Sequence, residues 1–158
     1  MRSSSHAGKK PLKASVISEQ KQLEKSQLVL GTAQLGMDYG IAYVVGKQDK
    51  HSAFEILNAA YEAGIRFFDT AQNYGDSEEI IGAYLKQNLD REFRVITKLN
   101  SVIDKRNKQE IIDAVELSSN YIGKTLEGVL LHDPAWINSW DKTIEDALEE
   151  CIRSEERR

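Results

Sequence analysis

From Leu28 onward, short apolar runs alternate with longer segments in which apolar residues recur at three- and four-residue intervals. The short runs carry apolar residues on both faces, which is typical of parallel strands covered by helices. They predict strands over residues 28–33, 65–71, 93–99 and 128–133. The periodic segments predict helices over residues 51–64, 76–89, 107–123 and 140–153. Four repeats of strand and helix indicate an α/β fold with a parallel sheet.

Two architectures fit this alternation: an open doubly wound sheet, or part of a (β/α)8 barrel. No GxGxxG motif follows the first strand, which argues against an open dinucleotide-binding sheet. The helix expected over 76–89 has its own start signal, since Asp76 or Ser77 can cap it. Glu78 and Glu79 in its first turn favour the positive end of the helix dipole.

Composition narrows the class of protein. The chain has 158 residues, 41% hydrophobic and 29% charged, as in a single globular domain. Its net charge of −4 argues against nucleic acid as a partner, and no apolar run approaches the ~20 residues that cross a membrane. One cysteine, Cys151, allows no internal disulfide and fits a reducing compartment, so we expect a cytoplasmic protein.

The first 27 residues differ from the rest, because residues 1–18 contain no acid, several Ser and Lys, and no apolar periodicity. We interpret residues 1–27 as a flexible extension and residues 28–158 as the folded domain. The alternative is a targeting segment, since such segments are basic, Ser-rich and poor in acids, although residues 1–18 show no clear amphipathic face.

Polar residues occur where three of the predicted strands end. Asp69, Lys98 and His132 lie at or next to the carboxyl ends of different strands, and Tyr74 lies in the loop after the second. Each has an ordinary structural interpretation: a turn cap, a loop aromatic, a lysine extended over apolar surface, or a histidine with satisfied hydrogen bonds. However, the carboxyl ends of parallel strands meet at one rim, where active sites of such folds lie.

An acid, a lysine, a tyrosine and a histidine at one rim suit proton donation to a carbonyl group. A free phenol has a pKa near ~10, and a neighbouring ammonium stabilises the phenolate. A carboxylate can hold that ammonium in place, and an imidazole can orient the carbonyl oxygen. None of these side chains can supply a hydride, so a reducing cofactor is needed.

These residues resemble the aldo-keto reductase family, whose members are (β/α)8 barrels that reduce aldehydes and ketones with NADPH or sometimes NADH. The similarity lies in "GTAQLG" (31–36), "DTAQNYGDSE" (69–78), "ITK" (96–98) and "LLHDP" (130–134). The resemblance implies that Tyr74 is the general acid, that Lys98 assists its ionisation and that Asp69 pairs with Lys98. It also implies that His132 orients the substrate and that Thr32 and Asp69 lie near the nicotinamide ribose. No metal is expected, because His6, His51 and His132 lack zinc-ligand spacing.

The resemblance covers only the first half of the family's barrel. A complete barrel has eight strands and ~250 residues, and its phosphate-binding loops usually follow strands seven and eight. We therefore expect four βα units with two open edges and an apolar inner face that includes Phe67, Ile96 and Leu130. Self-association or a separately encoded second half would cover that face. The chain is then either an oxidoreductase of aldo-keto reductase type or a non-catalytic half-barrel, as a fragment or an interaction module.

Overall fold

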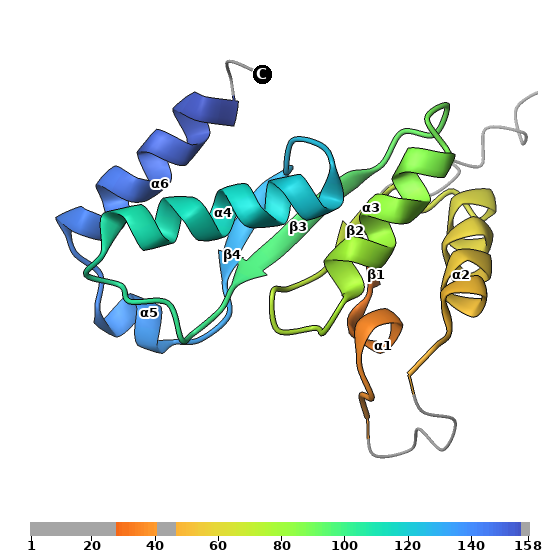
Figure 1. The fold of residues 1–158 in the computed structure, drawn as a ribbon, viewed down its shortest axis with the longest axis horizontal. Helices are drawn as coiled ribbons and strands as arrows, with labels where there is room; N and C mark the ends of the chain where they lie inside the picture. The colour runs from red at the N-terminus through yellow and green to blue at the C-terminus, as the bar shows by residue number, and fades with distance from the viewer. Residues whose placement is uncertain (1–27, 41–46, 156–158) are drawn as a thin grey trace, which may run out of the picture.

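The computed structural model describes residues 28–40 and 47–155. Four parallel strands form one sheet in the order β1-β2-β3-β4, so each strand pairs with the next one along the chain (Figure 1). The strands are β1 (Val29–Gly31), β2 (Phe67–Asp69), β3 (Arg94–Leu99) and β4 (Gly128–Leu131). This confirms the expected α/β class and the four βα units. The expected extension over residues 1–27 lies outside the described residues.

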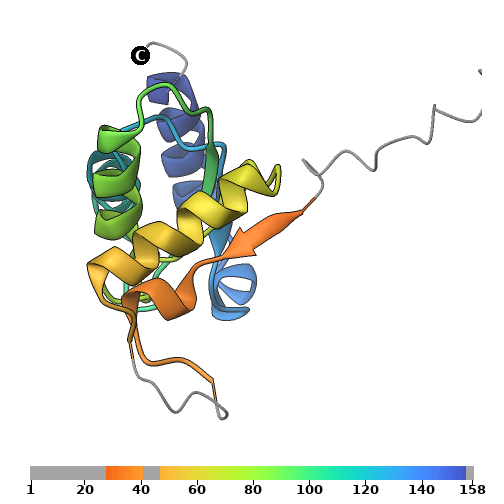
Figure 2. The same ribbon diagram turned by 90° about the vertical axis from the view of Figure 1, so that its right-hand side faces the viewer.

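Helices follow the strands in regular alternation. The long helices are α2 (Lys50–Glu62), α3 (Ser77–Gln87), α4 (Lys108–Ile122) and α6 (Lys142–Glu155). They correspond to the four helices expected from the apolar periodicity. Two single-turn helices, α1 (Ala33–Gly36) and α5 (Ala135–Asn138), follow β1 and β4 and are too short to give a periodic signal. Figure 2 shows α1 directly beyond the end of β1.

The helix ends agree with the sequence in part. Asn107 caps α4, because its side chain accepts hydrogen bonds from two backbone N–H groups, and Gly123 ends α4 with φ of 75°. Asp76 is the N-cap residue of α3, but its side chain makes no capping hydrogen bond. Its carboxylate instead accepts a hydrogen bond of 2.6 Å from the Lys47 ammonium. Asp76 therefore occupies the expected capping position, but its side chain binds Lys47 and does not cap the backbone.

The two faces of the sheet have different surroundings. In β2 and β3, the residues that face the helices are fully buried, among them Phe68, Val95 and Leu99. Those that face the other way, which we call the inner face, retain solvent contact, and Val29 and Leu130 are 50% and 48% exposed. The inner face consists of Val29, Gly31, Phe67, Asp69, Ile96, Lys98, Gly128 and Leu130, which the strand register aligns in rows.

The core lies between the sheet and the helices. The rings of Phe68 and Phe93 stack with centroids 4.4 Å apart, and Tyr84 of α3 meets Phe93 edge-on at 5.8 Å. Arg91 donates a 2.6 Å hydrogen bond to the Tyr84 hydroxyl and one of 2.7 Å to Asn58 of α2. This cluster fixes α2 and α3 against β2 and so fixes the start of the loop that follows β2.

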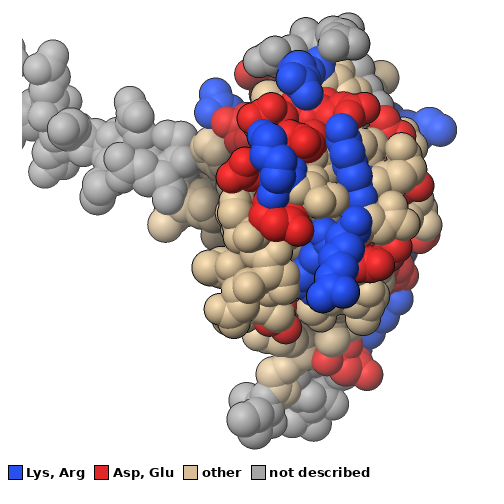
Figure 3. Space-filling model, turned by 90° about the vertical axis from the view of Figure 1, so that its left-hand side faces the viewer, with Lys and Arg blue, Asp and Glu red and all other residues tan. Residues whose placement is uncertain are grey.

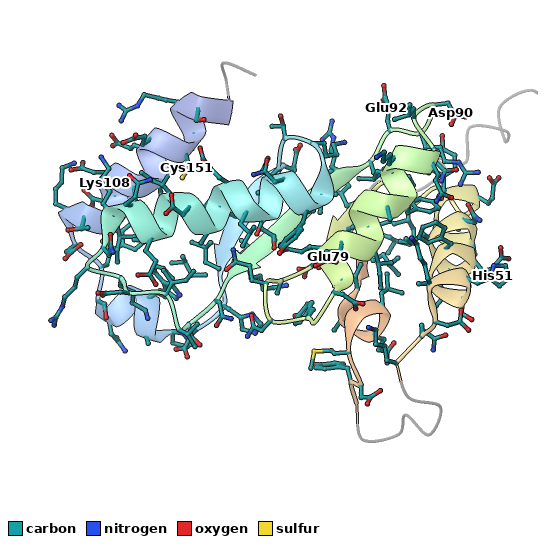
Figure 4. The ribbon with its side chains drawn as sticks, in the orientation of Figure 1. His51, Glu79, Asp90, Glu92, Lys108 and Cys151 are labelled. Carbon is teal, nitrogen blue, oxygen red and sulfur yellow. The ribbon has the colours of Figure 1, made fainter. Side chains whose placement is uncertain are left out.

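The last helix packs on α4 with its charged side chains outward. Lys108 of α4 pairs with Glu150 of α6 at 2.8 Å, and Lys142 pairs with Asp146 at 2.9 Å. Figure 3 shows basic and acidic side chains beside one another on this end of the molecule. Figure 4 shows Cys151 on the side of α6 that meets α4, where it is buried. Over residues 28–40 and 47–155, no helix combines the length and apolar character that a membrane crossing requires.

Candidate active site

The chain remains tied to β3 after β2 has ended. Thr70 donates its N–H to the Ile96 carbonyl at 2.9 Å, and Gln72 donates its N–H to the Lys98 carbonyl at 3.1 Å. These bonds continue the parallel ladder beyond Asp69, which stands opposite Ile96 in the register. The first part of the β2–α3 loop therefore follows the end of β3, and this brings the loop's side chains close to Lys98.

Tyr74 lies in a tight turn within this loop. Its N–H donates to the Ala71 carbonyl at 3.0 Å, and its carbonyl accepts from the Ser77 N–H at 3.1 Å. Gly75 follows with φ of 59°, a conformation that L side chains rarely adopt. Gly36 of α1 packs directly on this turn, since a Cβ placed there would lie 1.8 Å from the Tyr74 carbonyl oxygen. Backbone contacts on both sides thus define the position of Tyr74.

Lys98 connects the ends of β2 and β3 through its side chain. Its ammonium donates to the Asp69 carboxylate, and a second hydrogen bond of 3.3 Å goes to the Thr70 carbonyl. The Lys98 and Asp69 side chains are 17% and 35% exposed. The same ammonium lies 5.1 Å from the centroid of the Tyr74 ring. The expected pairing of Lys98 with Asp69 is therefore present in the structure.

His132 follows β4 and completes the group. The backbone N–H of His132 donates to the Leu99 carbonyl at 3.3 Å. The imidazole ring lies edge-on to the Tyr74 ring, with centroids 5.7 Å apart. Its Nδ1 atom is buried and has no hydrogen-bond partner among the residues that the structure describes. The buried Nδ1 atom is therefore not accessible to a molecule at the sheet's inner face.

The structure thus brings together the four residues that the sequence singled out. We call Asp69, Tyr74, Lys98 and His132 the rim cluster. A further aromatic residue, Tyr39, stands beside it, with its ring centroid 6.5 Å from that of Tyr74. Tyr39 had no sequence signal, because it lies on a loop without periodicity.

Thr32, the other residue expected at the site, is fully buried behind the rim cluster. Its N–H and its hydroxyl both donate to the Asp69 carbonyl at 3.0 Å. The hydroxyl of Ser77 lies 2.9 Å from the Thr32 hydroxyl and accepts a 3.0 Å hydrogen bond from Thr70. The contacts of Thr32 therefore hold Asp69 in place from behind, and its predicted contact with a ribose stays a prediction.

Glu78, which the sequence indicated only as a residue of a helix start, is a buried acid beneath β3. Glu78 accepts a 2.5 Å hydrogen bond from the Thr97 hydroxyl, and both residues are buried. Burial raises the pKa of the Glu78 carboxyl above its ordinary value, while hydrogen bonds from Thr97 and Ser118 oppose that shift. The sequence feature that could have indicated this buried acid is Thr97, a polar residue on the helix-facing side of β3, where its neighbours Val95 and Leu99 are apolar.

No metal centre accompanies the cluster in the described part of the chain, where no group of three or more His, Cys, Asp or Glu side chains could hold an ion. His51 is exposed on α2 and points away from the sheet (Figure 4). The chemistry of the rim cluster is therefore that of an ammonium, a carboxylate, a phenol and an imidazole.

Comparison with known proteins identifies the family. A family model described as the aldo/keto reductase family matches residues 27–154, which is most of the chain. The chain belongs to the aldo/keto reductase family. This confirms the resemblance seen in the sequence, and it identifies the four βα units as the N-terminal part of the family's (β/α)8 barrel.

Individual aldo-keto reductases and their relatives match over different lengths. An NADP(+) aryl-alcohol dehydrogenase from Phanerodontia chrysosporium is 32% identical over 115 residues, which are 70% of this chain and 29% of the dehydrogenase. A Pseudomonas aeruginosa structure classed with the aldo-keto reductases is 28% identical with a TM-score of 0.65, over 80% of this chain and 51% of that one. An aldo-keto reductase from Bombyx mori in complex with NADP is 26% identical, with a TM-score of 0.53, over 68% of this chain and 34% of that one. The chain thus spans between 29% and 51% of the length of these relatives.

Proposed function

We propose that the rim cluster donates a proton to a carbonyl oxygen, as part of the NADPH- or NADH-dependent reduction of an aldehyde or ketone. The observation that carries this proposal is the position of the Tyr74 ring. The ring centroid lies 5.1 Å from the Lys98 ammonium, and the ring meets the His132 ring edge-on with centroids 5.7 Å apart. A phenol between a cation and an imidazole is suited to release a proton and to regain it.

Each member of the rim cluster has one role in this mechanism. The Lys98 ammonium favours the charge that forms on the Tyr74 oxygen when its proton leaves for the substrate oxygen. Asp69 and the Thr70 carbonyl hold that ammonium in place, so its charge is already oriented before the reaction begins. His132 orients the carbonyl oxygen through Nε2, since its Nδ1 is buried.

The inner face beside the rim cluster fits the reacting end of a nicotinamide. A Cβ added at Gly31 would meet no atom within 4 Å, so the sheet has open space beside Asp69, its partner in the register. Asp69 is the residue of this chain that would contact the nicotinamide ribose, because the Thr32 hydroxyl is buried. A bound nicotinamide cofactor would supply the hydride that these side chains cannot. NADP in the names of two relatives supports NADPH as the first cofactor to test.

The proposal is tested by replacing Tyr74 with Phe. We expect Tyr74→Phe to lower the rate of NADPH oxidation with an aromatic aldehyde by about 10²- to 10⁴-fold, because the proton donor is lost. An aromatic aldehyde is the first substrate to use, because one relative is an aryl-alcohol dehydrogenase. Tyr121→Phe is the matched control, since Tyr121 is exposed on α4 and is not part of the rim cluster. Equal rates in Tyr74→Phe and wild type would exclude Tyr74 as the donor.

A second candidate function is that of a half-barrel whose activity requires another polypeptide to cover its inner face. The half-barrel could equally serve only as a binding module. The observation that favours it is the exposure of Val29 and Leu130 on the inner face, with β1 and β4 each paired on one side only. A second copy of the chain, or a separate second half, would complete the sheet. A wild-type chain that neither binds NADPH nor turns over the aldehyde, and that associates in a sizing run, would favour this candidate.

A further inference from the structure

Gln72 makes an unusual number of hydrogen bonds for a loop residue. It lies between Asp69 and Tyr74, and its amide group donates to the Ala114 carbonyl at 2.8 Å and to the Ser118 hydroxyl at 3.0 Å. Its amide oxygen accepts from the Asn100 N–H at 2.9 Å. Both hydrogens of the amide and its oxygen are therefore used, which leaves this side chain a single well-defined orientation.

These bonds link the Tyr74 loop to the segment that carries Lys98. Asn100 comes two residues after Lys98, and the Lys98 carbonyl itself accepts from the Gln72 N–H at 3.1 Å. Gln72 therefore contacts the backbone on either side of Leu99 and lies two residues before Tyr74. A movement of the loop away from β3 would break bonds at both positions.

The other anchor of Gln72 is a rigid element. Ser118 is 1% exposed on α4, a helix of fifteen residues that packs on α3 and α6. Ser118 also lowers the pKa of the buried Glu78 carboxyl, which accepts a hydrogen bond from Thr97 next to Lys98. One helix position thus binds the loop that carries Tyr74 and influences the acid under the strand that carries Lys98.

We propose that Gln72 is a positioning residue that holds Tyr74 at its distance from Lys98 and His132. The expected effect of Gln72 on proton donation rests on the proposed function. Its expected effect on the position of the Tyr74 ring does not. Gln72 itself acts through the backbone of its loop rather than on substrate. A merely stabilising Gln72 would affect the free energy of unfolding and leave the Tyr74 ring in place.

The variant Gln72→Met keeps the length of the side chain and removes its three hydrogen bonds. We expect the nuclear Overhauser effect (NOE) between the Tyr74 and His132 ring protons to be lost. We also expect kcat for aldehyde reduction to fall by about tenfold to a hundredfold, with KM for NADPH changed less than twofold. The NOE between the stacked Phe68 and Phe93 rings should persist, because their contact lies in the core. Gln109→Met is the matched control, since Gln109 is exposed on α4 and its amide donates a hydrogen bond to Asp113 on the same helix.

A second variant keeps the test decisive if Gln72→Met does not fold. Gln72→Asn retains the amide but is one methylene shorter, so it cannot reach both α4 and Asn100, and we expect the same loss of the ring NOE. A wild-type ring NOE in either folded variant would overturn the inference. A wild type that shows the ring NOE without turnover would refute the proposed function alone, and the geometric test of Gln72 would still apply.

Discussion

Gly36 is the position where one methyl group should have the largest effect on the rim cluster. It is the last residue of α1, and its backbone lies against the turn that contains Tyr74. In Gly36→Ala the new Cβ would lie 1.8 Å from the Tyr74 carbonyl oxygen, 2.4 Å from the Ser77 nitrogen and 2.8 Å from the Ser77 Cβ. Two of these atoms belong to the backbone, so a change of rotamer cannot relieve the contact.

The size of the effect follows from these distances. Real Cβ atoms essentially never approach another heavy atom within 3.0 Å, so α1 and the Tyr74 turn must separate by about 1.2 Å. Overpacking of this kind costs about 1–3 kcal/mol of stability. A misplacement of ~1 Å in a catalytic group can lower a rate by about 10²-fold. The adjacent Gly75 offers no room, because a Cβ there would lie 2.1 Å from the Gly36 carbonyl oxygen.

The assay pairs stability with geometry. Urea unfolding followed by tryptophan fluorescence gives the free energy of unfolding, and the Tyr74–His132 ring NOE reports the position of Tyr74. Gly82→Ala is the control, because its Cβ would lie 1.9 Å from the Tyr121 carbonyl oxygen, where α3 meets the end of α4. We expect both variants to lose stability, but only Gly36→Ala to lose the ring NOE and about 10²-fold in kcat.

Two results would refute this reasoning. If Gly36→Ala kept both the unfolding free energy and the ring NOE of wild type, the contact between α1 and the Tyr74 turn would not be tight. If Gly82→Ala lost the ring NOE to the same extent, general destabilisation rather than displacement of Tyr74 would explain the effect.

Two further predictions concern the layer behind the rim cluster. Burial raises the pKa of the Glu78 carboxyl in the folded chain above its value in the unfolded chain. The contribution of this carboxyl to stability is therefore fully present below the unfolded pKa, and it is lost as the pH rises through the folded pKa. The stability of Glu78→Gln relative to wild type should therefore increase as the pH rises from about 4 to 7, the range just above an ordinary carboxyl pKa. Urea unfolding at several pH values measures this difference. A stability difference that does not change with pH would contradict this. Phe68→Ala should lower the free energy of unfolding by about 3–5 kcal/mol, because the ring is fully buried and stacks on Phe93 with centroids 4.4 Å apart. A loss of under ~1 kcal/mol in the same urea unfolding assay would contradict this prediction.

The sequence was sufficient to predict the four strands, the four long helices and the edge at which polar side chains meet. Asp69, Lys98 and His132 each end an apolar run, and parallel strands bring such ends to one rim whatever the details of packing. Asp76 is the N-cap residue of α3, as one of the two predicted candidates, but its side chain makes no capping hydrogen bond. The capping signal is local, whereas the ion pair that engages Asp76 comes from Lys47, 29 residues away.

The contacts that support the rim cluster had no comparable signal. Gln72 and Ser118 are 46 residues apart, and neither residue type implies the other. Gly36 ends the "GTAQLG" motif, and only the fold shows that its missing side chain makes room for the Tyr74 carbonyl. Thr32 is fully buried behind Asp69, and the hydrogen bonds of its N–H and hydroxyl to the Asp69 carbonyl had no signal in the sequence.

The sequence by itself determined the order of strands and helices, the two faces of each strand and the residues at the carboxyl rim. These depend on periodicity and on local chemistry, which are properties of neighbouring residues. Only the tertiary structure decided that the Lys98 ammonium meets Asp69, that the Tyr74 ring lies near both Lys98 and His132, and that α4 holds the loop through Gln72. Those distances follow from strand register and helix packing, because contacts between segments far apart in the chain form only when the whole sheet and its helices are in place.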